Sequence, residues 1–139
     1  MIVIDTNVLS EALRPEPEPA VLDWIANQPR ASLFTTTVTR GEILYGIRLL
    51  SEGKRRRGLW DAAMHIFDED FADHVLSFDS ESADAYAEIA ASRKMAGRPI
   101  SQFDAMIAAV ARSRGASLAT RNVQDFADCG VDVVNPWTA

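Results

Sequence analysis

The sequence predicts an α/β fold: an α/β/α sandwich around a central, mostly parallel sheet of four to five strands. Short apolar segments alternate with longer segments in which apolar residues recur at helical spacing, and this order is typical of a parallel sheet covered by helices. The chain has 139 residues and contains no internal repeat or linker, so it forms one domain, residues 1–139.

Five short segments rich in apolar and β-branched residues are the expected strands. The first, I-V-I-D, ends on Asp5. Ligands of open parallel sheets bind outside the carboxyl ends of the strands, so the residues that end each strand are the first to inspect. The expected strands are residues 2–5, 32–38, 75–79, 116–120 and 131–136.

The segments between the strands predict six helices. A proline-rich stretch ends the first of them, and Gly97 and Gly115 stand where the last two end, as glycine commonly does after a helix. Gly53 is expected to end the third helix. The expected helices are residues 7–13, 20–28, 41–52, 59–72, 80–97 and 102–115.

The composition predicts a cytoplasmic protein that is not inserted in a membrane. Of the residues, 47% are apolar and 24% are charged, as in ordinary globular domains. Cys129 is the only cysteine, which excludes an intrachain disulfide and favours a reducing compartment. No apolar run approaches the ~20 residues of a membrane span, and the N-terminus lacks the features of a signal peptide.

A net charge of −6 argues against a general nucleic-acid binder, but the basic residues are unevenly distributed. The run G-K-R-R-R-G, residues 53–58, places Lys54, Arg55 and Arg56 side by side. These cations could bind RNA phosphates, or they could form a solvated turn between two helices. Arg121 follows the fourth expected strand and could contact a phosphate or pair with a nearby acid.

Four acidic residues occupy the places where strands end and helices begin. Asp5 ends the first strand, Glu42 and Asp104 lie near helix starts, and Asp125 follows the fourth strand. If the first, second and fourth strands are neighbours, these side chains meet at one edge of the sheet. Each acid taken alone also fits a helix cap, because acids near the first turn bond free backbone N–H groups and suit the helix dipole. Glu42, for example, fits the last position of a capping box headed by Thr39.

The four acids together favour a metal site over four separate caps. Carboxylates about 4 Å apart repel each other by about 4 kcal/mol at an effective dielectric of 20, so a cluster of them needs a counter-charge. No basic residue flanks Asp5 or Asp104 directly. An all-oxygen set of ligands suits Mg²⁺, or Mn²⁺, and such an ion can activate a water molecule and bind phosphate oxygens.

The ordered set of motifs resembles the PIN-domain family, and most closely its VapC-type toxins of bacterial type II toxin–antitoxin systems. The motifs are an N-terminal strand followed by Asp-Thr-Asn, Thr-x-x-Glu at Glu42, Asp104 at the start of an alanine-rich helix, and Ala-Thr-Arg-Asn-x-x-Asp-Phe before the last strand. The chain also carries the sequence Asn135-Pro136-Trp137, which is found near the end of one variety of these toxins.

The resemblance assigns roles to matching positions. Asp5 and Asp104 match the principal metal ligands and Glu42 a further acid, while the fourth acid of the family often stands where this chain has Asn122. Asp125 then completes the catalytic set, or the site has three acids and an amide. Polar residues expected to hold the carboxylates by hydrogen bonds are Thr6, Asn7, Thr39, Thr120 and Asn122.

The resemblance implies a Mg²⁺-dependent endoribonuclease, the toxin of a toxin–antitoxin pair, which hydrolyses RNA phosphodiester bonds with a metal-activated water. It also implies a cognate antitoxin protein and a homodimer. Two other functions stay open. A metal-dependent phosphomonoesterase would use Asp5 as nucleophile, although Asn7 stands where a second acid is usual. A non-enzymatic protein-interaction module would use the acids only as helix caps.

Overall fold

The fold is a five-stranded parallel sheet with helices on both faces, as predicted. The computed structural model describes residues 1–139. The strands lie in the order β3-β2-β1-β4-β5, and every neighbouring pair is parallel. In chain order the elements are β1 (Ile2–Ile4), α1 (Thr6–Ala12), α2 (Pro19–Asn27), β2 (Leu33–Thr36), α3 (Thr37–Arg48), α4 (Lys54–His65), β3 (Val75–Leu76), α5 (Ser80–Met95), α6 (Gln102–Ser113), β4 (Ser117–Ala119) and β5 (Val133–Val134).

The first, second and fourth strands are neighbours, which is the condition for their carboxyl ends to share one edge. Strand β1 lies in the middle, with Val3 paired to Phe34 of β2 and to Leu118 of β4. The carboxyl ends of these three strands therefore meet at one edge of the sheet. No helix in the structure has the length and apolar character that crossing a membrane requires.

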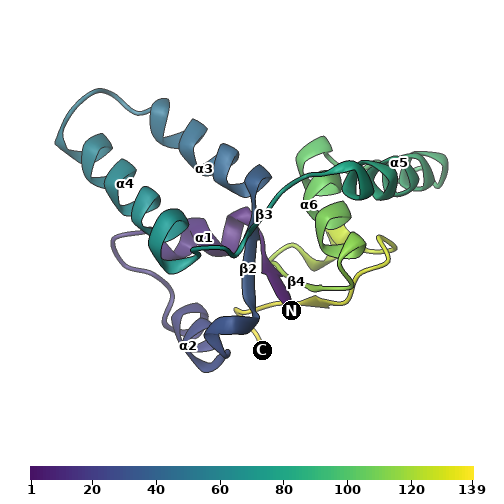
Figure 1. The fold of residues 1–139 in the computed structure, drawn as a ribbon, viewed down its shortest axis with the longest axis horizontal. Coiled ribbons are helices and arrows are strands. Elements are labelled where there is room, and N and C mark those ends of the chain that lie inside the picture. The colour runs from purple at the N-terminus through teal and green to yellow at the C-terminus, as the bar shows by residue number, and fades with distance from the viewer.

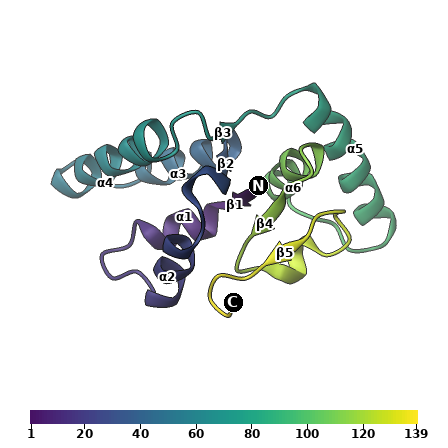
Figure 2. The ribbon, with the colours of Figure 1, turned by 60° about the horizontal axis from the view of Figure 1, so that its bottom comes forward.

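Alternation along β1 supplies one side chain to each of two hydrophobic cores. Val3 points into a core formed with α6 and α5, where Ile89 and Ala108 are buried. Ile4 points into the other core, which α1, α2, α3 and α4 cover with residues such as Leu9 and Ala63. Figure 2 shows α5 and α6 on one side of the strands and helices α1 to α4 on the other.

Helix α6 packs closely against both the sheet and α5 because its buried positions are mostly alanine. Ala105, Ala108, Ala109 and Ala111 are completely buried. The small side chains allow the helix backbones to approach, and Figures 1 and 2 show α5 alongside α6. Both helices are followed by a glycine with positive φ, at Gly97 (75°) and Gly115 (64°), as the sequence predicts.

The predicted boundary between the second strand and the third helix is wrong. Helix α3 begins at Thr37 and not at residue 41, because the Thr36 side chain accepts a hydrogen bond from the Thr39 N–H and caps the helix there. The strand before it is correspondingly shorter than residues 32–38.

The predicted helix 59–72 begins earlier and does not continue as an α-helix. Helix α4 begins at Lys54, so the basic run 53–58 forms its first turns and not a turn between helices. After His65 the chain continues as one π-helical turn, residues Ile66–Asp70. Figure 1 shows α3 and α4 as an extended hairpin at one end of the molecule.

Enlarging Ala109 in α6 is expected to destabilise the fold. The variant Ala109→Leu places three extra carbon atoms in a filled core, which costs about 1–3 kcal/mol of the free energy of unfolding. Urea denaturation measures this loss, with Ala87→Leu on the exposed face of α5 as the matched control. Equal stability of the two variants would show that α6 does not pack as closely as described.

Candidate active site

Asp5 caps a helix and also lies at the centre of the sheet edge. Its Oδ1 accepts a hydrogen bond of 3.1 Å from the Val8 N–H and so caps α1. The side chain is only 2% exposed. Burial raises the pKa of Asp5 to about 6, and the nearby charge of Asp104 adds to this rise, while hydrogen bonds from the Thr120 hydroxyl and the Val8 N–H oppose it.

Asp104 lies near the start of α6, across from Asp5. Ser101 caps this helix, with its Oγ accepting a hydrogen bond of 3.3 Å from the Asp104 N–H. Burial raises the pKa of the half-buried Asp104 carboxyl, and the neighbouring charge of Asp125 adds to that rise. The charge of Asp125 thus acts on Asp104 and the charge of Asp104 acts on Asp5, which puts the three aspartates in one region of the structure.

Glu42 reaches the same edge from α3. The Thr6 hydroxyl donates a hydrogen bond of 2.7 Å to Glu42 Oε1, and the hydroxyl of buried Thr39 lies 3.2 Å from the same Thr6 oxygen. The interpretation of Glu42 as the acid of a capping box headed by Thr39 is wrong, because Thr36 caps this helix. Glu42 stands in the second turn, where its carboxylate bonds no backbone N–H and is held by a side chain of α1.

Asp125 and Asn122 come from the segment after β4. Asp125 is exposed and lies in a 3₁₀ turn, residues Val123–Phe126, with its N–H donating to the Asn122 carbonyl at 3.0 Å. The Asn122 N–H donates to Thr120 Oγ1 at 3.1 Å. Thr120 is buried and also bonds Asp5, so one hydroxyl connects the central carboxylate with the start of this segment.

Sequence reasoning missed Arg93, which fixes the segment that carries Asp125. This arginine of α5 is 6% exposed and pairs with no acid. Its Nη1 donates to the carbonyls of Asp125 (2.8 Å) and Ala127 (3.0 Å), and its Nε donates to the Arg98 carbonyl (2.7 Å). An arginine in a helix usually faces solvent, so nothing in the local pattern distinguishes it.

None of the four clustered acids pairs with a basic residue. The chain has seven salt bridges, and none of them includes Asp5, Glu42, Asp104 or Asp125. The set consists of carboxylate oxygens only, partly buried and without a protein counter-charge, which is the chemistry that suits a hard divalent cation. As the side chains lie, no three of them are close enough to hold one ion together.

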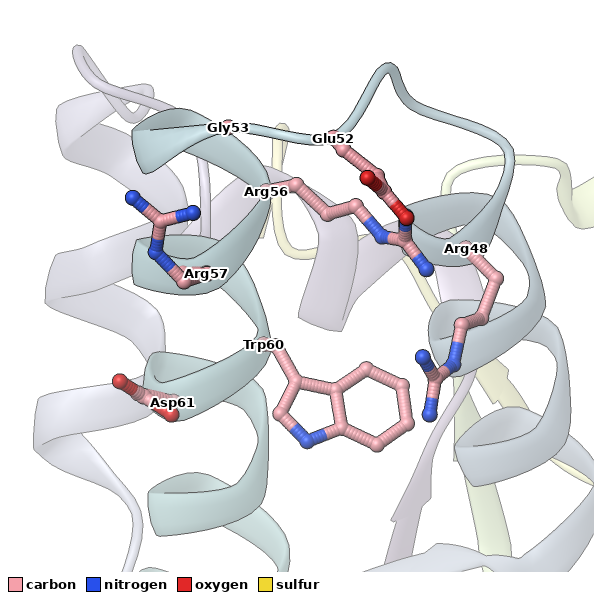
Figure 3. Close-up of a pocket in the computed structure, with 7 residues that line it drawn as sticks. All are labelled: Arg48, Glu52, Gly53, Arg56, Arg57, Trp60 and Asp61. Carbon is pink, nitrogen blue, oxygen red and sulfur yellow. The ribbon is translucent and has the colours of Figure 1, made fainter.

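The basic run of α4 divides between two surfaces. Arg55 lines a groove that also includes Thr6 and Glu42, whereas Lys54 is exposed at the helix start. Arg56 belongs to a separate pocket of about 370 Å³ between α3 and α4. Figure 3 shows Arg56 turned toward Glu52, 3.9 Å away, in the pocket that Trp60 also lines.

Several residues that line this separate pocket contact one another. The Arg48 guanidinium lies 4.2 Å from the centre of the Trp60 ring, a distance typical of cation–π stacking. Figure 3 shows Arg57 and Asp61 on the side of α4 away from this pair. Of the basic run, only Arg55 therefore lies beside the acidic edge.

Replacing Asp5 is expected to stabilise the metal-free protein at neutral pH. The folded-state pKa of about 6 exceeds the usual 3.8, so the folded state binds more protons and its stability falls as pH rises from about 3.8 through 6. Asn keeps the helix cap but carries no charge. In EDTA at pH 7.5, the free energy of unfolding of Asp5→Asn is expected to exceed that of the wild type by up to about 3 kcal/mol.

Urea denaturation at pH 7.5 and pH 4 tests this expectation. The gain in free energy of unfolding should be smaller at pH 4 than at pH 7.5, and the exposed control Asp84→Asn should show no such pH dependence. A less stable Asp5→Asn at pH 7.5 would mean that hydrogen bonds to the ionised carboxylate outweigh its burial.

Comparison with known proteins agrees with the fold and with the order of these motifs. A family model described as "PIN domain" matches residues 2–130. The chain is 42% identical over 139 residues to the plasmid stability protein StbB of Pseudomonas syringae pv. tomato, covering 100% of both chains. It is 37% identical over 137 residues to the VapC ribonuclease Y4jK of Sinorhizobium fredii, covering 99% of this chain and 98% of that protein.

A solved structure is also similar to this chain over almost its whole length. The structure of FitAB bound to an IR36 DNA fragment superposes with a TM-score of 0.92 at 35% identity, covering 99% of this chain and 96% of that chain. These matches span the whole edge that carries Asp5, Glu42, Asp104 and Asp125. The chain belongs to the PIN-domain family, with the VapC-type toxins among its relatives.

Proposed function

We propose that this protein is a Mg²⁺-dependent endoribonuclease, with Mn²⁺ as an alternative ion, and that it acts as the toxin of a toxin–antitoxin pair. One observation supports the proposal: the charge of Asp104 acts on Asp5 and that of Asp125 acts on Asp104, while Glu42 is bonded to Thr6 beside Asp5, and none of the four pairs with a basic residue. The name of the relative Y4jK, a VapC ribonuclease, supports the substrate class.

The residues would share the work of holding the ion and the substrate. Asp5 and Asp104 are the principal ligands in this proposal, with Glu42 as a third and Asp125 completing the edge. A divalent ion bound there supplies a Lewis acid for a phosphate oxygen and lowers the pKa of a water molecule. Thr6 and Thr120 hold Glu42 and Asp5 by hydrogen bonds, which limits the rotation of these two carboxylates.

The side chains near the site favour attack by water over attack by the protein. Burial raises the pKa of the only thiol, Cys129, which keeps it protonated. His74 lies with Nδ1 2.7 Å from the Leu33 carbonyl at the other end of β2, away from the acids. Neither this thiol nor this imidazole is placed to act at the acids, and water is the nucleophile in this proposal.

Partners follow from the relatives and from the surface. Because FitAB is a complex and was solved on DNA, a cognate antitoxin is expected to bind this chain.

A homodimer is also expected. Tyr45 and Phe103, which are 67% and 53% exposed, line a groove of about 800 Å³ with Phe78 and Met106. Exposed apolar surface of this kind is typical of a protein interface.

Removing either principal ligand is expected to abolish RNA cleavage. In Asp104→Asn and Asp5→Asn, losing several kcal/mol of charge stabilisation lowers the initial rate of cleavage of total cellular RNA by roughly 100-fold or more. Gel or sequencing analysis in Mg²⁺, Mn²⁺ and EDTA measures this, with Asp84→Asn as a charge-matched control on the exposed surface. Undiminished cleavage by Asp104→Asn would exclude the mechanism, and phosphate release from a monoester with no RNA cleavage would favour the phosphomonoesterase.

Metal binding is expected to raise thermal stability. An ion that binds only the folded state contributes about 2.7 kcal/mol at 100 times its Kd, which raises the Tm by several degrees. Differential scanning fluorimetry with Mn²⁺ should show this shift in the wild type and in Asp84→Asn, but not in Asp5→Asn. A wild-type Tm that does not respond to Mg²⁺ or Mn²⁺ would favour the interaction module whose acids only cap helices.

A further inference from the structure

A polar pocket of about 500 Å³ lies directly beside the acidic edge. It is lined by Asn7 and Arg14 of α1, by Arg121 and Asn122 after β4, and by Trp137 near the end of the chain. Asn7 stands two residues after Asp5, and Asn122 accepts the Asp125 N–H through its carbonyl. The pocket is therefore lined by residues of the two segments that also carry Asp5 and Asp125, although neither carboxylate lines it.

Arg121 is the free cation of this pocket. It is exposed, and none of the seven salt bridges of the chain includes it, so the alternative of an ion pair with Asp125 or Glu42 is not found. Arg14, by contrast, lies 3.3 Å from the buried carboxylate of Glu11, which also accepts the Glu18 N–H. The pocket thus contains one neutralised pair and one uncompensated positive charge.

Trp137 supports the Arg121 side chain. The guanidinium lies 5.0 Å from the centre of the Trp137 ring, within the range of cation–π attraction. The main chain that carries this ring is fixed, because the Trp137 backbone N–H donates to Asn135 Oδ1 at 2.9 Å and because Pro136 beside it is buried. The Asn-Pro-Trp sequence is thus a turn that places an aromatic ring beneath a cation.

The backbone under Arg121 is equally fixed. The Thr120 N–H donates to the Val134 carbonyl at 2.9 Å, and its hydroxyl bonds both Asp5 and the Asn122 N–H. Arg121 can therefore move relative to the carboxylates only through its own side-chain torsions, which the indole ring limits further. A planar donor held in this way suits a phosphate group, which takes two parallel hydrogen bonds from arginine.

We propose that this pocket binds a phosphate of the RNA strand next to the scissile bond, with Arg121 as the ligand and Trp137 as the residue that positions it. The proposal rests on the ribonuclease function proposed above. The acids need a cation before they can approach a phosphate, whereas Arg121 attracts one without it. Asn7 and Asn122 offer amide donors at the rim of the same pocket.

The test separates substrate binding from chemistry. Relative to the wild type, Arg121→Gln is expected to raise KM for RNA cleavage by about tenfold with kcat little changed, since a charge-assisted hydrogen bond is lost in both ground and transition state. Arg121→Lys should recover part of the loss, and Trp137→Phe, which keeps an aromatic ring, should raise KM less than Arg121→Gln does. Arg30→Gln, exposed before β2 at the opposite end of the sheet, is the matched control.

A binding measurement gives a readout independent of cleavage. Fluorescence anisotropy of a labelled, mixed-sequence single-stranded RNA is followed at several KCl concentrations on the Asp104→Asn background. Arg121→Gln should reduce the slope of log K against log salt by about 0.7, as the loss of one phosphate contact predicts. Arg30→Gln should leave the slope unchanged.

Three outcomes would overturn the proposal. These are an unchanged KM and salt slope in Arg121→Gln, an equal effect in Arg30→Gln, or a fall in kcat together with loss of the Mn²⁺-induced Tm shift, which would mean that Arg121 only screens the acids. If the wild type cleaves no RNA, the proposed function fails first. If the wild type cleaves RNA but Arg121→Gln changes neither KM nor the salt slope, only this inference is rejected.

Discussion

The buried carboxylate of Asp5 is the constraint on which the rest of the site depends. The central strand of the sheet ends on this residue, and the two neighbouring strands end at the same level. Its 2% exposure makes ionisation costly, as the raised pKa shows. The fold accepts this cost because the backbone N–H of Val8 and the Thr120 hydroxyl both bond the carboxylate. A helix cap and a site residue are here the same side chain, and the two interpretations of Asp5 do not compete.

The other acids reach that edge by different routes. Glu42 depends on a side chain of another helix, because the Thr6 hydroxyl of α1 bonds its carboxylate. Asp104 depends on the first turn of its own helix, capped by Ser101. Asp125 lies on an exposed turn outside any α-helix. The site is therefore rigid at its centre and most open on the side of the segment after β4, where the pocket with Arg121 and Trp137 also lies.

The sequence predicted the sheet, and it predicted that Asp5 lies where the central strand ends, because both follow from periodicity and from where strands end. The predictions were wrong where the local sequence allowed two alternative structures. Two threonines could cap α3, and the choice of Thr39 over Thr36 moved the expected start of that helix to residue 41. The basic run looked like a turn, yet Arg48 and Trp60 pack α4 against α3 from its first turns.

The contacts around the segment after β4 could not be predicted at all. They depend on distances between residues 93 and 125 or 121 and 137, which no local pattern encodes.

The unpaired Arg93 has a consequence for electrostatics at this edge. Its charge is spread over main-chain carbonyls and is cancelled by no carboxylate. A guanidinium does not titrate in the physiological range, so this positive field beneath the 3₁₀ turn is constant with pH. The molecule thus holds, beneath the main chain of this turn, a buried positive charge that pairs with none of the four carboxylates and that dissolved salt screens only weakly. The edge is therefore less repulsive to an incoming polyanion than four carboxylates alone would be.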